Sequence, residues 1–381
     1  MKKTYISILS ILFLLALSAC GREREIVSYD LTTSLYYDTT VSIRLFHEED
    51  EDIEDIKDEL HEIMRKTHRL SSWFQSYEGI INVKTINENP GVFHEVDPVL
   101  FDMIALSIEY YEQTDGYFDI TLGPVIEIWD EYRDRCNRWR SSIASEENRD
   151  ELYEQEKDDY CKAPNIEKLQ AANAYVGIDR IELDYDNYAI KIEAGTKLDL
   201  GGVAKGYGAR MLGEYLKTED RIEAFLVNAG SSNVEVYGDH PFRDNNKFII
   251  ALTNPALPFG PNNSYGQIYL QSGENAVTSG DYNRYYEVDG RIYHHLIDPN
   301  TLFPTDHHRA VTLISDDGAL GDILKTAVFV MSLEKGLEFI NNRDDLEAIW
   351  FIDECQEPVM SDGFEANHLR HFTIDFECND D

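Results

Sequence analysis

The stretch KLDLGGVAKGYG, residues 197–208, carries the clearest structural signal in the sequence. A short strand-like run leads into two glycines, and apolar residues then recur at helical spacing as far as Leu216. The pattern predicts a strand that runs through a glycine-rich turn into a helix. Glycines let a ligand approach the backbone, the start of a helix presents free N–H groups, and Lys205 adds a positive charge. Such a turn suits a phosphate or pyrophosphate, although it matches neither GxGxxG nor GxxxxGK[ST] and also reads as a tight structural turn.

Strand-like and helical patterns alternate on both sides of this segment. Helices are expected over residues 52–70, from Asp97-Pro98 onward, and over residues 320–331. The expected strands cover residues 35–46, 190–192, 198–200, 224–227, 233–237, 248–252, 311–314 and 346–352. Because the elements follow no regular βαβ period, the sequence predicts an α+β fold rather than a doubly wound sheet.

Composition limits the classes of partner. The chain has 381 residues, of which 43% are hydrophobic, so it can bury a sizeable core. Lys and Arg number 34 and Asp and Glu number 72, which gives a formal net charge of −38. Such a surface repels a phosphate backbone, so nucleic acid is not an expected partner. The acidity itself is typical of high solubility or a saline habitat.

The N-terminus has the pattern of an export signal. Residues 1–19 read as a signal peptide, with two lysines ahead of an apolar core too short for a permanent membrane span. The core ends in LSAC, which resembles the lipobox of bacterial lipoproteins, where the cysteine is acylated. We therefore expect a lipidated Cys20 with a tether over residues 20–34, a folded domain over residues 35–381, and a periplasmic location at the bacterial cell membrane. An ordinary signal peptide with a chance cysteine is the alternative.

Four further cysteines suggest disulfides in an exported chain. Of the three possible pairings, sequence proximity favours Cys136 with Cys161 and Cys355 with Cys378. Metal ligation is the rival, but no CxxC spacing supports it. Residues 131–163 are charge-dense and poor in aliphatic side chains, so we interpret them as a disulfide-bonded surface insertion outside the core.

Two segments carry candidate polar chemistry. In GDILKTA, residues 321–327, Asp322 and Thr326 are four residues apart on one helix face and could both reach a hard cation such as Mg²⁺. The simpler interpretation of Asp322 is an acid near the positive end of a helix. After SGDY at residues 279–282, HHLIDPNT at residues 294–301 contains His295, which could serve as a base or orient a phosphate, or could be structural.

Two aromatic segments could bind a flat heterocycle. TDGYFD, residues 114–119, places rings beside an acid, and LSSW, residues 70–73, ends in a tryptophan. Both could supply stacking surfaces and hydrogen-bond acceptors. Each also reads as ordinary core followed by a turn.

Taken together and in this order, these segments resemble the ApbE-type FAD:protein FMN transferases, a family of exported enzymes usually tethered as lipoproteins. LDLGGVAKGYG is similar to the family's DLGG-x-AKGY, GYFD to G-[AF]-FD, SGDY to SG-[DN]-Y, HHLIDPNT to H-[IV]-IDP-x-TG, and GDILKTA to AD-x-x-[SA]-TA. The similarity covers residues 35–352 apart from the insertion.

The resemblance implies an α+β fold with mixed or antiparallel sheets, packed helices and an FAD cleft. By position, the FAD site would be lined by Trp73, Tyr117, Phe118, Asp119, Asp199 and Lys205. Mg²⁺ would be held by Asp322, Thr326 and the carbonyl of Gly202. His295 would lie beside the phosphates as the base, so that His295 and Asp322 are the expected catalytic residues.

The implied reaction transfers FMN from FAD to a threonine hydroxyl of an acceptor protein, with release of AMP. Family acceptors carry a Ser/Asp-Gly-Ala-Ser/Thr-Ala-Thr type motif and belong to exported electron-transfer complexes. This chain contains no such motif, so self-flavinylation is not expected.

Some positions depart from the family pattern. NAGGD appears as NAGSSN at residues 228–233, TG appears as Thr301-Leu302, and Tyr37-Asp38-Thr39 replaces Met-Gly-Thr. These changes alter the expected flavin contacts but leave the metal pair and the glycine turn intact. Two other functions stay open: an FAD pyrophosphatase that uses water as the acceptor, and a flavin-binding lipoprotein without catalysis, which would be expected to lack Asp322, Thr326 or Lys205.

Overall fold

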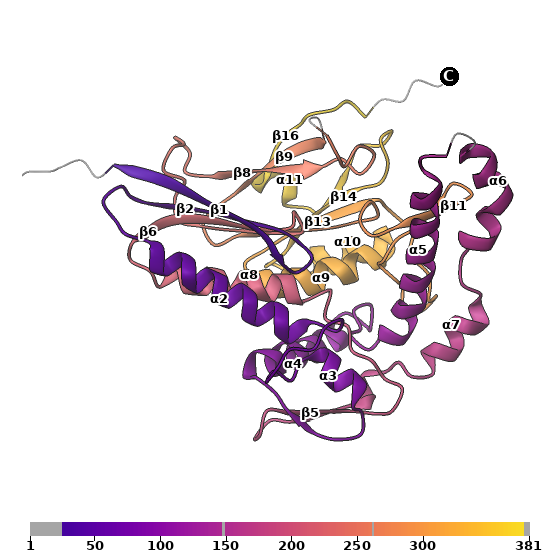
Figure 1. Cartoon of the computed structure of the whole chain (residues 1–381). Helices are drawn as coiled ribbons and strands as arrows, with labels where there is room; N and C mark the ends of the chain where they lie inside the picture. Colours follow the sequence, from indigo (N-terminus) through magenta and orange to yellow (C-terminus); the bar gives the residue numbers. More distant parts are fainter. Residues whose placement is uncertain (1–24, 147–148, 261–262, 377–381) are drawn as a thin grey trace, which may run out of the picture.

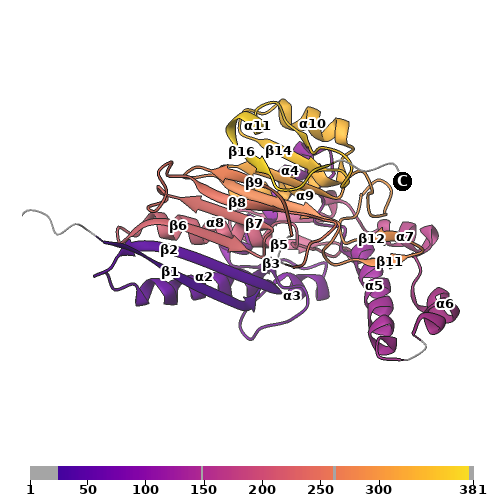
Figure 2. The same ribbon diagram turned by 90° about the horizontal axis from the view of Figure 1, so that it is seen from above.

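An eight-stranded antiparallel sheet forms the centre of the fold in a computed structural model that describes residues 25–146, 149–260 and 263–376. Its strands lie in the order β1-β2-β6-β7-β10-β13-β14-β15, and Figure 2 shows β1, β2 and β6 side by side at one edge. Their bounds are β1 Ile26–Tyr36, β2 Thr39–Glu48, β6 Ile222–Ala229, β7 Asn233–Tyr237, β10 Asn275–Gly280, β13 Ala310–Ser315, β14 Glu347–Phe351 and β15 Val359–Met360.

Three long helices cover one face of this sheet (Figure 1). They are α2 (Glu54–Ser71), α8 (Ala204–Lys217) and α9 (Gly318–Val330). Alternate residues of β2, including Val41 and Ile43, are buried against α2 and α8, as the two-residue period of a strand requires. The helical and strand patterns expected at residues 52–70, 320–331 and 224–227 are therefore confirmed.

The opposite face of the main sheet packs against a smaller, three-stranded sheet in the order β16-β9-β8 (Figure 1). Phe46 of β2 points to this side, opposite to its neighbour Leu45. With both faces buried, the main sheet separates two apolar layers. The strands of the smaller sheet are β8 Phe248–Thr253, β9 Ser264–Leu270 and β16 Leu369–Phe372.

Among the remaining elements, α4 contacts α2 and α9, and α11 contacts β14 and β16. Asp97 caps α4 through a hydrogen bond from the Val99 N–H, with Pro98 in the first turn, as the sequence predicts. The other elements are α3 Val83–Glu88, β3 His94–Glu95, α4 Pro98–Gln113, α5 Gly123–Ile143, α6 Arg149–Tyr160, α7 Ile166–Asn173, β4 Ile181–Asp184, β5 Ala189–Ile192, β11 Tyr286–Val288, β12 Arg291–Tyr293, α10 Leu333–Asn341 and α11 Phe364–Asn367.

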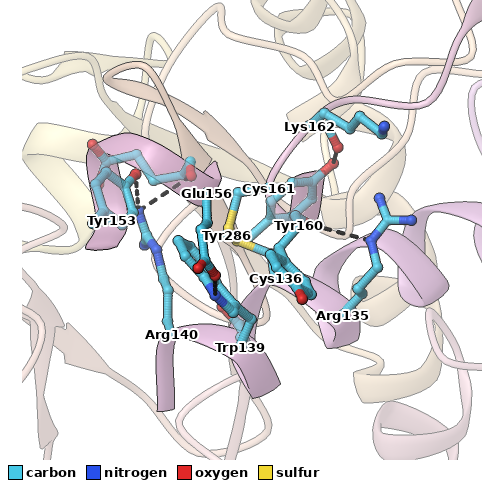
Figure 3. Close-up of a disulfide and its surroundings, with 12 residues drawn as sticks. Arg135, Cys136, Trp139, Arg140, Tyr153, Glu156, Tyr160, Cys161, Lys162 and Tyr286 are labelled. Atoms are coloured by element: carbon cyan, nitrogen blue, oxygen red, sulfur yellow. Dashed lines mark hydrogen bonds between the residues drawn. A yellow bond between two sulfur atoms is a disulfide. The ribbon is translucent and has the colours of Figure 1, made fainter. Parts of the chain in front are cut away.

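The expected insertion at residues 131–163 is a helical arm with a core of its own. Helices α5 and α6 project beside the main body (Figures 1 and 2). A disulfide joins Cys136 to Cys161 with a Cα–Cα distance of 4.6 Å, which confirms that pairing (Figure 3). Trp139 stacks on Tyr153 and Tyr160 beside it. None of the described residues of this segment belongs to the apolar layers of the main body, and aromatic rings and the disulfide form a separate small core in place of the missing aliphatic side chains.

Three expectations are corrected. Residues 35–46 form two strands with a turn at Tyr37 and Asp38, and β1 begins at Ile26, so most of the expected tether at residues 20–34 is part of the sheet. Residues 198–200 form no strand: the Leu198 N–H bonds to the Asn87 side chain and the Asp199 N–H to the Ile120 carbonyl.

Two expectations concern residues that are not described. The signal peptide and Cys20 lie outside the described residues, as does Cys378, so the lipid anchor and the second disulfide stay predictions. Within the described ranges, no helix is both long and apolar enough to cross a membrane.

Candidate active site

A cleft of about 430 Å³ gathers the residues that the sequence singled out. It lies among the glycine turn before α8, the start of α5, the C-terminal end of β10 and the middle of α9. Every predicted site residue except Asp322 lines it: Trp73, Tyr117, Phe118, Asp119, Asp199, Gly202, Lys205, His295 and Thr326. Segments that are far apart in the sequence therefore form one site.

Two glycines hold the walls of the cleft close together. A Cβ atom at Gly202 would lie 2.8 Å from the Phe118 ring, and a Cβ at Gly206 would lie 2.2 Å from the Gly318 carbonyl oxygen. The turn and the first residues of α8 therefore pack directly against their neighbours. A side chain at Gly202 or Gly206 would prevent this close packing. This close approach places the Gly206 N–H beside α9, where it donates to Asp322 Oδ2 at 2.8 Å.

Asp322 lies directly behind the cleft wall and is fully buried. Its Oδ2 accepts from Gly206, whereas Oδ1 accepts no hydrogen bond. Thr326, one turn later on α9, lines the cleft and donates its hydroxyl to the Asp322 backbone carbonyl at 3.0 Å. The Asp322 carboxylate and the Thr326 hydroxyl supply oxygen ligands of the kind that a hard cation prefers.

A cation at this place would need further oxygen ligands. The described residues contain no group of three or more His, Cys, Asp or Glu side chains that could hold a metal ion. Hydroxyl, backbone carbonyl and substrate oxygens would have to complete the coordination, which is typical of Mg²⁺. Thr326 and the backbone at Gly202, both at the cleft surface, are placed to contribute.

Lys325 occupies the space next to Asp322. Its ammonium lies 2.7 Å from Asp322 Oδ1 and 2.5 Å from the hydroxyl of Ser232. The contact to Oδ1 is close enough for a direct ion pair, although the angles do not make a favourable hydrogen bond. The sequence analysis did not single out this lysine.

Two further cations face the cleft. Burial lowers the pKa of Lys205 to about 8, against an opposing effect of Asp322. The Lys205 ammonium donates to the Gly201 carbonyl at 3.3 Å, and Arg284 lines the same cleft. A phosphate that entered here would therefore meet positive charge in a partly desolvated setting, where charge interactions are stronger than in water.

The two predicted acids of the FAD site accept hydrogen bonds from residues two positions further along the chain. Asp119 accepts from the N–H and hydroxyl of Thr121, and Asp199 accepts from the Gly201 N–H at 2.7 Å. Burial raises the pKa of both carboxyls. Both acids thus fix the turns that carry them and present an acceptor to the cleft.

The neighbouring histidines differ in role. His295 lines the cleft, and its Nδ1 lies 3.1 Å from the Asn283 carbonyl, which can only accept. The proton is therefore on Nδ1, and Nε2 keeps a free lone pair. Burial holds the pKa of His295 well below its usual range, so the ring is neutral at pH 7. His294 instead donates to the Thr305 carbonyl and accepts from the Leu296 N–H, which makes it structural.

Aromatic rings form one wall of the cleft. Trp73 and Phe74 have ring centroids 4.3 Å apart, and the Phe74 side chain is exposed. Tyr117 and the buried Phe118 line the same cavity. Flat apolar surfaces with acids and hydroxyls nearby suit a planar heterocycle with polar edges.

The sequence analysis missed the contribution of α5. Asp130 and Arg133 line the cleft and form an ion pair, and burial is the main cause that raises the pKa of Asp130. The insertion boundary at residue 131 cut through this helix, which begins at Gly123. Gly123-Pro124 is the sequence signal from which the start of this helix could have been predicted, because proline is favoured in the first turn of a helix.

Comparisons with known proteins place most of the chain in one family. The profile described as the ApbE family matches residues 37–350. An FAD:protein FMN transferase of Klebsiella pneumoniae is 29% identical, covering 68% of this chain and 70% of that protein. One of Haemophilus influenzae is 27% identical, covering 89% and 90%. The crystal structure of the ApbE protein from Thermotoga maritima has a TM-score of 0.71 at 27% identity, covering 89% of this chain and 99% of that one. The matched range contains every site residue described above, and the chain belongs to the ApbE family.

Proposed function

We propose that this chain transfers FMN from FAD to a threonine hydroxyl of an acceptor protein and releases AMP. The observation that carries the proposal is one cleft that brings together an aromatic wall, the cations Lys205 and Arg284, and Thr326, with Asp322 directly behind the wall. Family members named FAD:protein FMN transferase support the reaction class.

Each part of the cleft matches one part of FAD. The wall formed by Trp73, Tyr117 and Phe118 would stack on a flavin ring. Lys205 and the N-terminal turn of α8 would bind the pyrophosphate. Asp322, Thr326 and the Gly202 carbonyl would hold Mg²⁺, which when bound would offset the charge that grows on the pyrophosphate.

His295 would act as the base. Its Nε2 lone pair would take the proton of the threonine hydroxyl as that oxygen bonds to the phosphorus of the FMN half. The bond from this phosphorus to the bridging oxygen would break, and the oxygen would leave with AMP. A low pKa makes His295 a weak base but keeps it unprotonated across the neutral range.

The N-terminal pattern adds a proposal about location. Lipidation at Cys20 would anchor the enzyme at the extracytoplasmic, periplasmic face of the membrane, where an exported acceptor with the short Thr-containing motif is accessible. The Cys136–Cys161 disulfide supports an oxidising compartment. The acidic chain is not expected to bind nucleic acid.

The test follows AMP and free FMN with the chain from Gly21 onward, FAD and Mg²⁺, with and without a carrier that bears the acceptor motif. We expect AMP chiefly with the carrier, which becomes covalently fluorescent. Free FMN that accumulates equally without the carrier would instead identify an FAD pyrophosphatase. Turnover in neither condition, with FAD still bound, would identify a flavin-binding protein without catalysis.

Two variants assign the roles within the same assay. Asp322→Ala should abolish Mg²⁺-dependent AMP release, whereas Glu334→Ala, an exposed acid on α10, should leave it unchanged. His295→Gln should still bind FAD but lose transfer. Full transfer by His295→Gln would mean that this ring only packs against the cleft.

A further inference from the structure

A buried lysine holds the carboxylate that the proposed metal needs. Lys325 and Asp322 lie three residues apart on α9, with side chains 6% and 0% exposed. The ammonium nitrogen lies 2.7 Å from Asp322 Oδ1. Because both groups are shielded from water, this pair is not one of the weak ion pairs of protein surfaces.

The two oxygens of Asp322 are not equivalent. Oδ2 accepts the Gly206 N–H, a contact that fixes α8 against α9. Oδ1 is therefore the oxygen left for a cation, and it is the one next to the Lys325 ammonium. A divalent cation on Oδ1 would lie within a few ångströms of that ammonium, and the two like charges would repel strongly at low effective dielectric.

Lys325 has other oxygen partners within reach. Its ammonium lies 2.5 Å from Ser232 Oγ, 3.4 Å from the Ser232 carbonyl and 3.3 Å from the Thr278 carbonyl. These acceptors belong to the loop before β7 and to β10, and Lys325 itself lines the cleft. The ammonium can therefore leave Asp322 without losing all its hydrogen bonds.

We propose that Lys325 is a resident counter-ion that competes with the divalent cation for Asp322. In the metal-free protein the Lys325 ammonium neutralises the Asp322 carboxylate. A buried carboxylate without a partner of opposite charge would destabilise the fold. Metal binding requires the ammonium to move away from Asp322 Oδ1 while it keeps its contacts with Ser232 and Thr278. The proposal rests on the proposed function insofar as it takes Asp322 as a metal ligand.

The test measures Mn²⁺ binding by the electron paramagnetic resonance signal of the free ion, without FAD and at one pH. Lys325→Met keeps the length of the side chain but removes its charge. It should lower the Kd for Mn²⁺ by about tenfold or more, which corresponds to about 1.4 kcal/mol. Thermal unfolding gives a second readout: Mn²⁺ should raise the midpoint of Lys325→Met by more than that of the wild type.

A control in the same cleft separates the possible results. Lys205→Met removes a charge that acts on Asp322 without direct contact, so it should lower the Kd by clearly less than Lys325→Met does. Equal tightening by Lys205→Met and Lys325→Met would overturn the proposal, because general cleft charge would then explain the effect. An unchanged or weaker affinity in Lys325→Met would also overturn it.

Asp322→Asn tests the metal site separately. If this variant binds Mn²⁺ as the wild type does, the metal role in the proposed function fails. If Asp322→Asn loses binding while Lys325→Met binds as the wild type, only the competition fails. Should Lys325→Met not fold, Lys325→Gln can still donate a hydrogen bond to Asp322 and is expected to tighten Mn²⁺ binding in the same direction.

Discussion

Three residues adopt a backbone conformation that favours glycine, at the positions where this chain departs from the family pattern. Asp38, Ser231 and Leu302 have φ values of +52°, +55° and +64°. The left-handed region costs an ordinary residue about 1–2 kcal/mol relative to right-handed geometry. These turns therefore form in this chain without glycine at the three positions.

Ser231→Gly should therefore stabilise the protein. Ser231 is exposed, and its N–H donates to Asn228 Oδ1 at 2.8 Å, a bond that glycine keeps. We expect the free energy of unfolding in urea to rise by about 1 kcal/mol. Ser231→Ala, which retains the Cβ, should give no such gain. Equal values for both variants would show that the backbone at this position is not strained.

The polar residues of the site were predictable to different degrees. Asp322 and Thr326 could be found from their four-residue spacing, because helix geometry alone places them on one face. The role of Lys325 could not be predicted from the sequence, because its partners Ser232 and Thr278 are 93 and 47 residues away. Its contact with Asp322 depends on how α9 packs against the sheet.

At the scale of elements, strongly periodic segments were predicted well and weakly patterned ones were not. The amphipathic helix α2 and the strand β7 lie where the sequence placed them. The β1–β2 hairpin was missed because β1 buries few of its side chains and the turn at Tyr37 and Asp38 lacks glycine, proline and asparagine. The order of strands in the sheet rests on contacts between distant segments, which one sequence does not reveal.

The disulfide arm gives the prediction at this scale. Cys136 and Cys161 are 25 residues apart, and cross-linking a loop of this size stabilises by about 3 kcal/mol in the chain-entropy model. The double variant Cys136→Ser/Cys161→Ser should lose stability of that order. The loss should be seen in denaturant unfolding followed by Trp139 fluorescence, since that ring stacks on Tyr160 beside the bond.

FAD binding should change much less in this variant. The residues that α5 gives to the cleft lie before the disulfide, and the ion pair of Glu127 with Lys197 anchors that half of the helix. The conservative control is Ser141→Ala, which alters an exposed residue of α5. A double variant as stable as the wild type would mean that aromatic stacking alone holds the arm.

At the scale of the whole molecule, the chain carries a formal charge of −38, and Glu235 is one of the acids that the fold buries. Glu235 on β7 is 2% exposed and faces α8, where a Cβ at Gly213 would lie 2.0 Å from its carboxylate. Its Oε1 accepts from the Lys217 ammonium at 3.0 Å, and Oε2 accepts no hydrogen bond. Burial raises the pKa of Glu235 to about 7, against the opposing effect of Lys217.

This buried acid predicts how stability depends on pH. The folded protein binds the Glu235 proton more tightly than the unfolded chain, whose pKa is 4.5, so this stability is complete below 4.5 and is lost as pH rises through about 7. Glu235→Gln stays neutral, so it should match the wild type at about pH 4 and below and exceed its free energy of unfolding by about 3 kcal/mol at pH 8.5. Because many acids titrate in this chain, the difference between variant and wild type is the quantity to follow by urea unfolding. Glu223→Gln, at an exposed position of the neighbouring strand β6, should show no such pH-dependent difference. A difference that stays constant from pH 5 to pH 8.5 would mean that Glu235 is ionised throughout and that Lys217 fully compensates its burial.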